Sequence, residues 1–574
     1  MSEGVEEIID AGRPYDFGLD AGSKAELTAV VAMNLSPKSL VIVNGYKDYA
    51  VIKTALLGIK MGKQVILVVE KLSELYQIIG ISREMSVTPM IGIRTKLSTR
   101  GSGRWESSGG EFAKFGLTTP ELLHAVNVLK KEGLQDCFKL LHFHIGSQVT
   151  NIRVIKDAVK EATRIYAKLR KMGLKLEYLD VGGGLGVDYD GSRTSFDSSI
   201  NYSLQEYVGA VVYSIKEVCE AEEVDEPNIV SESGRALVAH HSVLLVNVFG
   251  SIEVGTTPIA FEETDDEAEV VKEMRYLSQN LTSKNLLEHF HDALTRKEEA
   301  LSMFKLGILS LEDKAKVEHI FWQICRVIHK NATGLKYVPD EVEALNKHLA
   351  DQYLCNFSLF QSMPDHWAVS QLFPIVPIHR HDEEPTHSAT LVDITCDSDG
   401  KVCKFIDLRD IRDTLQLHAL KANEPYYLGF FLMGAYQDIM GDLHNLFGRV
   451  NEVHVFLDET EPGGYYIEEV IKGNNIAGVL SWIQYSATDL AKRVKEQIDL
   501  RVREGSIKPR EGVELQNFYE AVLHGYTYVD VEKQSGLNQM ALDEAARHNG
   551  GAGLTAVPEA LVETPTGVLQ AVIK

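Results

Sequence analysis

The stretch Leu179-Asp-Val-Gly-Gly-Gly-Leu-Gly-Val-Asp-Tyr-Asp-Gly191 is the most informative part of the sequence. A short apolar run ends in three glycines, a pattern typical of a strand that leads into a turn whose backbone amides can approach a ligand. Successive N–H groups in such a turn form a nest suited to phosphate. A tight turn without a ligand explains three glycines equally well. The spacing argues against a dinucleotide site or a P-loop, because it matches neither Gly-x-Gly-x-x-Gly nor Gly-Lys-Ser/Thr.

Apolar runs of this kind recur through the first part of the chain, and helix-period segments such as 155–171 and 204–221 separate them. Alternating strands and helices predict parallel βα units, and polar residues at the strand ends are where a (β/α)₈ barrel keeps its site. We expect an α/β fold of this barrel type that lacks its first strand, with a segment missing upstream of Met1. Seven strands are predicted, near 17–20, 40–44, 65–70, 90–94, 140–146, 179–184 and 229–234.

The texture of the sequence changes after the seventh predicted strand. Dense charges and few glycines predict a helical insertion, strand patterns return after it, and a final Gly-, Ala- and Pro-rich stretch predicts disorder. We therefore expect a barrel over 1–258, a helical insertion over 259–352, a mostly antiparallel β domain over 353–479, a helical region over 480–531 and a disordered tail over 532–574.

Composition narrows the class of protein. The net charge of −24 disfavours nucleic acid and anionic membranes as partners. Six scattered cysteines without a Cys-x-x-Cys pair indicate reduced thiols. The acidic N-terminus has no signal-peptide pattern, and no apolar run has the length of a membrane span. We predict a cytoplasmic enzyme.

Two further strand ends carry candidate binding residues. In His142-Phe-His-Ile-Gly-Ser-Gln148, a period of two puts His142 and His144 on one side, where an imidazole can stack on a planar cofactor. In Ser231-Glu-Ser-Gly-Arg-Ala236, Glu232 is placed to bond a heterocycle nitrogen and Arg235 to bind a phosphate. Each has a structural alternative: a histidine in a core, and a Glu232 that merely pairs with Arg235.

Two charged segments follow in the predicted β domain. Thr395-Cys-Asp-Ser-Asp-Gly400 places a thiol, a possible proton donor, beside two carboxylates that suit a cationic substrate. An Asp-Gly hairpin turn is the structural alternative. His379-Arg-His-Asp-Glu-Glu384 is either a metal site or a solvated loop, and no metal ligand is assigned.

Taken together, these segments resemble the biosynthetic arginine decarboxylases, which use pyridoxal 5′-phosphate (PLP) on the alanine-racemase-like barrel shared with ornithine and diaminopimelate decarboxylases. The likeness runs from about residue 8 to about residue 530. The predicted helical insertion also resembles this subfamily. Further matching stretches are Phe17-Gly-Leu-Asp-Ala-Gly-Ser-Lys-Ala-Glu-Leu27, Lys114-Phe-Gly-Leu-Thr-Thr119, Gln361-Ser-Met-Pro-Asp-His-Trp367, Gly434-Ala-Tyr436 and Gly441-Asp-Leu-His-Asn-Leu-Phe-Gly448.

The resemblance implies roles for individual residues. His144 would stack on the PLP ring, and Glu232 would keep its pyridine nitrogen protonated. Cys396 would return a proton to Cα after CO₂ leaves, and Asp397 and Asp399 would hold the guanidinium of L-arginine. The phosphate would be surrounded by Ser147, Gly182, Gly183, Gly184, Gly234, Arg235 and Tyr436. Substrate contact would come from Leu179, Asp180, Val181, Leu185, Gly186, Val187, Asp188 and Tyr189.

The resemblance also implies partners and cofactors. The Cys-Asp segment would reach the site of a partner subunit, so we expect a homodimer or higher homo-oligomer. Mg²⁺ is implied by the family alone. The lysine that carries PLP would lie in a Pro-Ile-Lys-Val-Asn-like segment shortly before Phe17, and we expect it upstream of Met1. Neither Lys53 nor Lys60 matches that segment.

The expected function is PLP-dependent decarboxylation of L-arginine to agmatine and CO₂, in polyamine biosynthesis. Two alternatives remain open. One is a catalytically impaired fragment or a decarboxylase-like regulatory protein. The other is a decarboxylase of ornithine or diaminopimelate.

Overall fold

The computed structural model describes residues 2–99, 101, 110, 113–254, 261, 264, 266–282, 285–332, 340–407, 411–421, 424–530 and 569–573. The chain forms two compact units, which are described separately below. The first unit holds Met1–Ser242 and Leu432–Tyr436, and the second holds Val243–Phe431 and Gln437–Ile573.

The first unit contains a seven-stranded parallel sheet whose strands follow one another in sequence order. All seven predicted strands are confirmed. Within the described residues, β1 and β7 are the two edges of this sheet. The strands are β1 (Leu19–Ala21), β2 (Leu40–Val43), β3 (Gln64–Val69), β4 (Met90–Arg94), β5 (Phe138–His142), β6 (Tyr178–Asp180) and β7 (Asn228–Val230).

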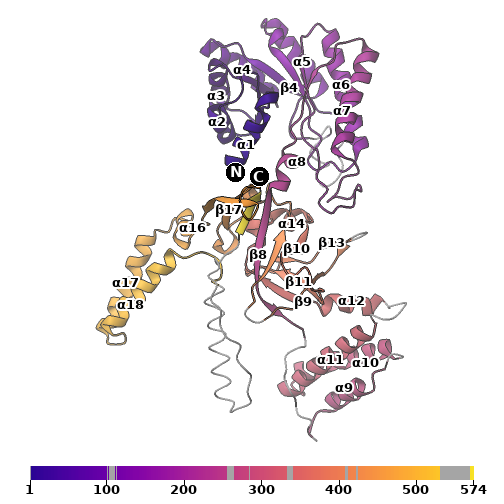
Figure 1. Ribbon diagram of the computed structural model, residues 1–574, viewed down its shortest axis with the longest axis vertical. Coiled ribbons are helices and arrows are strands. Elements are labelled where there is room, and N and C mark those ends of the chain that lie inside the picture. Colours follow the sequence, from indigo (N-terminus) through magenta and orange to yellow (C-terminus); the bar gives the residue numbers. More distant parts are fainter. Residues whose placement is uncertain are drawn as a thin grey trace. The chain divides into compact units, whose positions relative to one another are not determined.

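Helices connect these strands and lie on the outside of the sheet (Figure 1). The two helices predicted from periodicity, α6 and α7, are confirmed, and α7 begins with a capping box in which Ser203 and Glu206 satisfy each other's backbone N–H groups. The helices are α1 (Ser2–Gly12), α2 (Lys24–Ala32), α3 (Tyr49–Lys60), α4 (Leu72–Met85), α5 (Thr119–Lys131), α6 (Ile152–Lys171), α7 (Leu204–Glu222) and α8 (Gly234–Val238), with short 3₁₀ turns at Arg13–Tyr15, Gln135–Cys137 and Ala239–His241.

Strands β2 to β6 are largely buried on both faces, as parallel βα units require, whereas the edge strand β7 is exposed at Asn228 and Ile229. On β3, Val65, Leu67 and Val69 belong to the large core beneath the helices, whereas Ile66 and Val68 join a separate small cluster with Leu140. This alternation places the second cluster on the inner face of the sheet.

The sheet curls strongly. The side chain of Asn44, directly after β2, donates a hydrogen bond of 2.5 Å to Glu232, which follows β7. Strands β3 to β6 lie between them in the sheet order, so the contact crosses the inside of the curl. The curled parallel sheet is barrel-like, and an eighth strand that closes it stays a prediction.

The second unit is built on a larger sheet of mixed direction. The sequence predicts a mostly antiparallel domain, but β9 pairs with β11, and β17 with β19, in parallel. Most other pairs are antiparallel, including β8 with β9 and β8 with β16. Its strands are β8 (Ser242–Ile252), β9 (Asp351–Cys355), β10 (Ile375–Pro377), β11 (His387–Val392), β12 (Lys401–Val402), β15 (Leu415–Leu417), β16 (Tyr426–Phe430), β17 (Asn451–Leu457), β18 (Tyr465–Ile471) and β19 (Leu569–Ile573), and β13 (Phe405–Ile406) pairs with β14 (Ile411–Arg412) in a separate ribbon.

Helices complete the second unit. The predicted insertion is a bundle with its own core, which includes Val271, Met274, Ala293 and Ile324. The tail over 532–574 differs from the prediction in one part, because β19 is a strand of the sheet, and residues 531–568 lie outside the described residues. No helix in the described part of the chain is long and apolar enough to span a bilayer. The helices are α9 (Glu269–Gln279), α10 (Leu286–Lys305), α11 (Leu311–Ala332), α12 (Asp340–His348), α13 (Leu359–Ser362), α14 (Pro364–Val369), α15 (Gln437–Met440), α16 (Ile476–Trp482), α17 (Ala487–Arg503) and α18 (Pro509–Leu523), with a 3₁₀ turn at His444–Leu446.

Candidate active site

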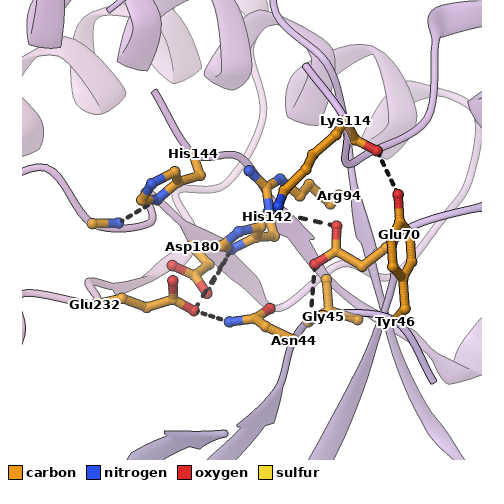
Figure 2. Close-up of polar contacts among 12 residues, drawn as sticks. Asn44, Gly45, Tyr46, Glu70, Arg94, Lys114, His142, His144, Asp180 and Glu232 are labelled. Carbon is orange, nitrogen blue, oxygen red and sulfur yellow. Dashed lines mark hydrogen bonds and ion pairs between the residues drawn. The ribbon is translucent and has the colours of Figure 1, made fainter. Parts of the chain in front are cut away.

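Three neighbouring strands bring predicted residues to one edge of the curled sheet. Leu141 of β5 pairs with Leu179 of β6, which pairs with Ile229 of β7. Because parallel strands end at the same edge, the segments that follow them meet there. Figure 2 shows His144, Asp180 and Glu232 gathered at this place.

A buried acidic cluster forms the floor of the site. His142 Nδ1 lies 2.9 Å from Asp180 Oδ2 and 3.9 Å from Glu232 Oε1. The first contact is short but is not aligned as a hydrogen bond, so His142 Nδ1 and Asp180 Oδ2 are buried without a hydrogen-bond partner. Asn44 Oδ1 is in the same state. Polar atoms of this kind at a strand edge indicate a place where a ligand completes the bonding.

Burial sets the protonation of this cluster. It raises the pKa of Glu232 from 4.5 to about 8, with the neighbouring Asp180 as the second cause. It raises the pKa of Asp180 from 3.8 to about 7 and lowers the pKa of His142. Burial therefore favours the neutral form of His142 and the protonated forms of Glu232 and Asp180.

His144 lies beyond the end of β5, against the glycine turn. The Gly183 N–H donates to His144 Nδ1 over 3.2 Å, and a Cβ on Gly183 would come within 3.1 Å of the ring. Burial lowers the pKa of His144 to about 3, so the imidazole is neutral and presents a flat, uncharged face.

The triple glycine is required by the fold itself. Gly182 has φ +65° and Gly184 has φ +110°, conformations that favour glycine. A Cβ on Gly182 would lie 2.2 Å from the Phe143 carbonyl oxygen. The Gly182 N–H donates to Asp180 Oδ1 over 2.8 Å, which ties the turn to the acidic floor. The structural explanation of the glycines thus holds, and it leaves their role toward a ligand open.

Arg235 lies in helix α8, which begins directly after the Glu232 segment. Its guanidinium donates to Ser147 Oγ over 3.2 and 3.1 Å and to the Tyr189 hydroxyl over 2.9 Å, and it lies 4.7 Å above the Tyr436 ring. The alternative in which Glu232 serves only Arg235 does not describe this arrangement, because Glu232 is bonded to Asn44. Around Gly234 an added Cβ would meet open space.

Sequence reasoning missed three residues that line this edge. Glu70 accepts the Gly45 N–H over 3.1 Å and lies 3.5 Å from Arg94, and Asn44 reaches Glu232 (Figure 2). Each closes an apolar run in the sequence, so the signal of a polar residue at a strand end was present. The sequence could not show which strand ends meet.

Most residues of the stretch predicted to contact substrate, 179–189, pack in the core or form hydrogen bonds within the protein. Leu179, Val181 and Leu185 belong to the hydrophobic core. Asp188 accepts a hydrogen bond of 2.7 Å from Ser199. The Val187 N–H donates to Gln148 over 2.9 Å, and the Gly186 N–H donates to Tyr202 over 3.2 Å. Substrate contact by this stretch stays a prediction, and for the three core residues only the backbone can provide it.

Cys396, Asp397 and Asp399 lie in the second unit. Cys396 is exposed, in the predicted Asp-Gly turn between β11 and β12. The Asp399 N–H donates to Asp397 Oδ1 over 2.8 Å and the Gly400 N–H to the Asp397 carbonyl over 3.0 Å. This geometry is compatible both with a plain Asp-Gly turn and with a segment that contacts substrate, since the thiol and the two carboxylates are exposed.

The segment His379–Glu384 makes structural bonds. His379 Nε2 accepts the Tyr427 N–H over 2.9 Å, and Arg380 pairs with Glu383 over 2.7 Å. Across the residues that the structure describes, the group with metal-ligand spacing is instead His142, Asp180 and Glu232.

With this geometry in view, comparison with known proteins defines the class. Residues 6–239 match the pyridoxal binding domain of the pyridoxal-dependent decarboxylases. Residues 264–346 match the arginine decarboxylase helical bundle domain, and residues 476–528 match the arginine decarboxylase C-terminal helical extension. The first unit is thus a pyridoxal-binding domain, and PLP is its cofactor.

Relatives and solved structures agree. A biosynthetic arginine decarboxylase of Bacteroides thetaiotaomicron is 50% identical, over 92% of this chain and 83% of its own. One of Phocaeicola vulgatus is 48% identical over the same shares. The crystal structure of the biosynthetic arginine decarboxylase of Campylobacter jejuni matches with a TM-score of 0.79 at 35% identity, over 92% of this chain and 84% of that one. The chain belongs to the biosynthetic arginine decarboxylase family.

Proposed function

We propose that this protein decarboxylates L-arginine to agmatine and CO₂ with PLP, and so supplies polyamine biosynthesis. The observation that carries the proposal is the 50% identity to a biosynthetic arginine decarboxylase over 92% of the chain. The two arginine decarboxylase domains matched outside the pyridoxal-binding domain favour arginine over ornithine or diaminopimelate.

The residues of the first unit fit PLP. When bound, PLP supplies a conjugated, protonated ring that draws electrons from the bond to the departing carboxylate. Glu232 would face the ring nitrogen and keep the proton on it. Asn44, bonded to Glu232 over 2.5 Å, would fix the orientation of that carboxyl group. The unpartnered polar atoms of Asn44, His142 and Asp180 support a ligand at this floor.

The remaining walls suit the other parts of the cofactor. The neutral imidazole of His144, held by Gly183, would stack on the ring face. Arg235 would pair with the phosphate together with Ser147, Tyr436 and the backbone of the glycine turn. Arg235 is held in place by the Ser147 and Tyr189 hydroxyls, so its guanidinium is oriented before the phosphate arrives.

The second unit would supply the substrate side. Asp397 and Asp399 offer carboxylates to the guanidinium of arginine, and Cys396 offers a proton for Cα. Their exposure in a turn is compatible with delivery to the site of a partner subunit, so we propose a homodimer or higher homo-oligomer.

We assign no lysine to covalent attachment of PLP. Lys47 is buried near the site, but its ammonium donates to the Gly45 carbonyl over 2.6 Å and lies 3.7 Å from Glu74. These contacts support a structural role for Lys47. We likewise assign no Mg²⁺ site. The group with metal-ligand spacing, His142, Asp180 and Glu232, is the one that we propose faces the ring nitrogen of PLP. A cytoplasmic location remains our prediction.

The test is a comparison of substrates. The purified chain, supplied with PLP, is assayed for amine product from arginine, ornithine, lysine and meso-diaminopimelate. The proposal predicts the highest kcat/KM for arginine, and no turnover without PLP. A preference for ornithine or diaminopimelate would support the alternative substrate, and turnover of none would support an impaired or regulatory protein.

A further inference from the structure

Two segments of the second unit meet at a pair of hydrogen bonds. The Cys396 N–H donates to Asn445 Oδ1 over 2.9 Å, and Asn445 Nδ2 donates to Cys396 Sγ over 3.2 Å. Both ends of one carboxamide are therefore used on one residue. The bonds fix the backbone of Cys396 and the direction of its thiol together.

The segment that carries Cys396 is anchored to helix α13. Asp393 Oδ2 accepts the Leu359 N–H over 2.8 Å, and Asp393 Oδ1 accepts the Thr395 N–H over 2.9 Å. A Cβ on Gly400 would lie 2.1 Å from Asp393 Oδ1, so the turn closes tightly on this carboxylate.

The segment that carries Asn445 is anchored to the same helix. The Asp442 N–H donates to the Phe360 carbonyl over 2.9 Å, and the His444 ring lies 4.8 Å from the Phe360 ring. A Cβ on Gly441 would lie 2.0 Å from the Gln361 carbonyl oxygen. Both segments are thus anchored to helix α13, which fixes their positions relative to each other.

The backbone of Asn445 is in the left-handed region, with φ 53° and ψ 20°. Apart from glycine, asparagine is among the residues that best tolerate this conformation. Glycine would have no carboxamide to offer Cys396. Position 445 therefore joins a backbone requirement to a side-chain requirement that asparagine meets.

We propose that Asn445 is a positioning residue that aims the Cys396 thiol at Cα of the substrate, an inference that rests on the proposed function. After CO₂ has left, the S–H bond breaks, its proton forms the new C–H bond with the electron pair left at Cα, and its own electrons stay on sulfur as a thiolate. Water later returns the proton. The Asn445 N–H occupies one sulfur lone pair, so the S–H bond points away from Asn445, and the same N–H stabilises the thiolate that forms.

Two variants separate the requirements at this position. Asn445→Gly keeps the left-handed backbone and removes the carboxamide. Asn445→Asp keeps the acceptor for the Cys396 N–H and replaces the donor to sulfur by a negative charge. The first readout needs no activity: alkylation of Cys396 by iodoacetamide in the full chain, measured by peptide mass spectrometry against Cys403. We expect Asn445→Asp to slow alkylation of Cys396 by about fivefold, because two negative charges then face each other near the surface.

The second readout follows the proton. Turnover of arginine in D₂O should place one deuteron at the carbon that lost CO₂, in one configuration, and Asn445→Gly should mix the configurations while the KM for arginine stays near the wild-type value. In a Cys396→Ala background, Asn445→Gly should change neither kcat nor configuration further, because residues that act as a unit are not additive.

The outcomes are distinct. An unchanged alkylation ratio in Asn445→Asp overturns the positioning role whether or not the chain is active. An equal loss of kcat from Asn445→Gly in the Cys396→Ala and wild-type backgrounds also overturns it. Absence of agmatine from the wild-type chain would count against the proposed function, and the alkylation result would still decide the role of Asn445.

Discussion

Asn44 and Glu232 are joined by a 2.5 Å hydrogen bond although β3 to β6 separate their strands in the sheet. The bond ties the second strand to the seventh across the inside of the curl. It also leaves Asn44 Oδ1 buried without a hydrogen-bond partner and fixes one carboxylate oxygen of Glu232. One hydrogen bond therefore both joins the two sides of the curled sheet and orients Glu232, the proposed partner of the ring nitrogen.

Removing the Asn44 carboxamide should weaken cofactor binding through Glu232. We expect Asn44→Ala to lower the affinity for PLP by about fivefold, the usual worth of one hydrogen bond. The control ligand is 1-deazapyridoxal 5′-phosphate, which lacks the ring nitrogen. The affinity for this control ligand should not change in Asn44→Ala. Glu232→Gln should likewise weaken the binding of PLP and leave the binding of the control ligand unchanged. Equal losses for both ligands, measured by equilibrium titration, would contradict the assignment of Glu232 to the nitrogen.

The buried carboxyl pair should make the unloaded chain less stable as the pH rises. Burial raises the pKa of Asp180 from 3.8 to about 7 and that of Glu232 from 4.5 to about 8. Between the unfolded and the folded pKa of each group, the folded chain keeps a proton that the unfolded chain has released. The free energy of unfolding therefore falls with rising pH, by up to about 1.4 kcal/mol per pH unit for each group. Burial lowers the pKa of His142. Below the unfolded pKa of 6.5, His142 therefore makes the free energy of unfolding rise with pH.

Asp180→Asn removes one of these carboxyls and leaves His142 in place. Relative to the wild type, we expect this variant to gain stability steadily between about pH 4 and about pH 7, the unfolded and folded pKa values of Asp180. Urea unfolding of the chain without PLP measures the difference. A difference that does not vary with pH would show that Asp180 is not held protonated in the folded state.

Arg235 should act on the phosphate and not on the ring. We expect Arg235→Ala to lower the affinity for PLP by about 10- to 100-fold, because a charge-assisted bond is lost. The affinity for pyridoxal, which has no phosphate, should stay the same. Arg235→Lys keeps the charge but not the paired bonds to Ser147, and an intermediate loss is expected. A parallel loss for pyridoxal would indicate that the variant disturbs the site as a whole.

The glycine turn offers a matched pair for stability. Gly182 and Gly191 both have positive φ, but an added Cβ meets the Phe143 carbonyl oxygen at 2.2 Å from Gly182 and open space from Gly191. Gly191→Ala should cost about 1 kcal/mol for its backbone alone. Gly182→Ala should cost more, about 3 kcal/mol or above, because the backbone must also move. Equal midpoints in urea unfolding of the two variants would contradict the close approach.

The sequence was most predictive where a signal is local. The seven parallel strands follow from apolar runs with polar ends, the helices of the insertion follow from dense charges with few glycines, and the structure confirms both. The parallel pairing of β9 with β11 was missed because pairing depends on topology, which the period of a single strand does not reveal.

The site divides in the same way. His144, Gly183 and Glu232 stand at the ends of neighbouring strands, and strand order alone brings them together. Asn44 was missed because its contact with Glu232 crosses the sheet over a separation of 188 residues. Asn445 was missed for the same reason, since it lies 49 residues from Cys396, and its left-handed backbone has no sequence signal stronger than the asparagine itself.

The most direct test of the central claim uses carboxyl-labelled L-arginine and the full chain, with and without PLP. Labelled CO₂ and agmatine are measured together in the wild type and in Glu232→Gln. We predict equal amounts of both products in the wild type, none without PLP, and a rate about 100-fold lower in Glu232→Gln, within the range for loss of a positioned acid–base group. Absence of labelled CO₂ from the wild type supplied with PLP would contradict the claim that this chain is an arginine decarboxylase.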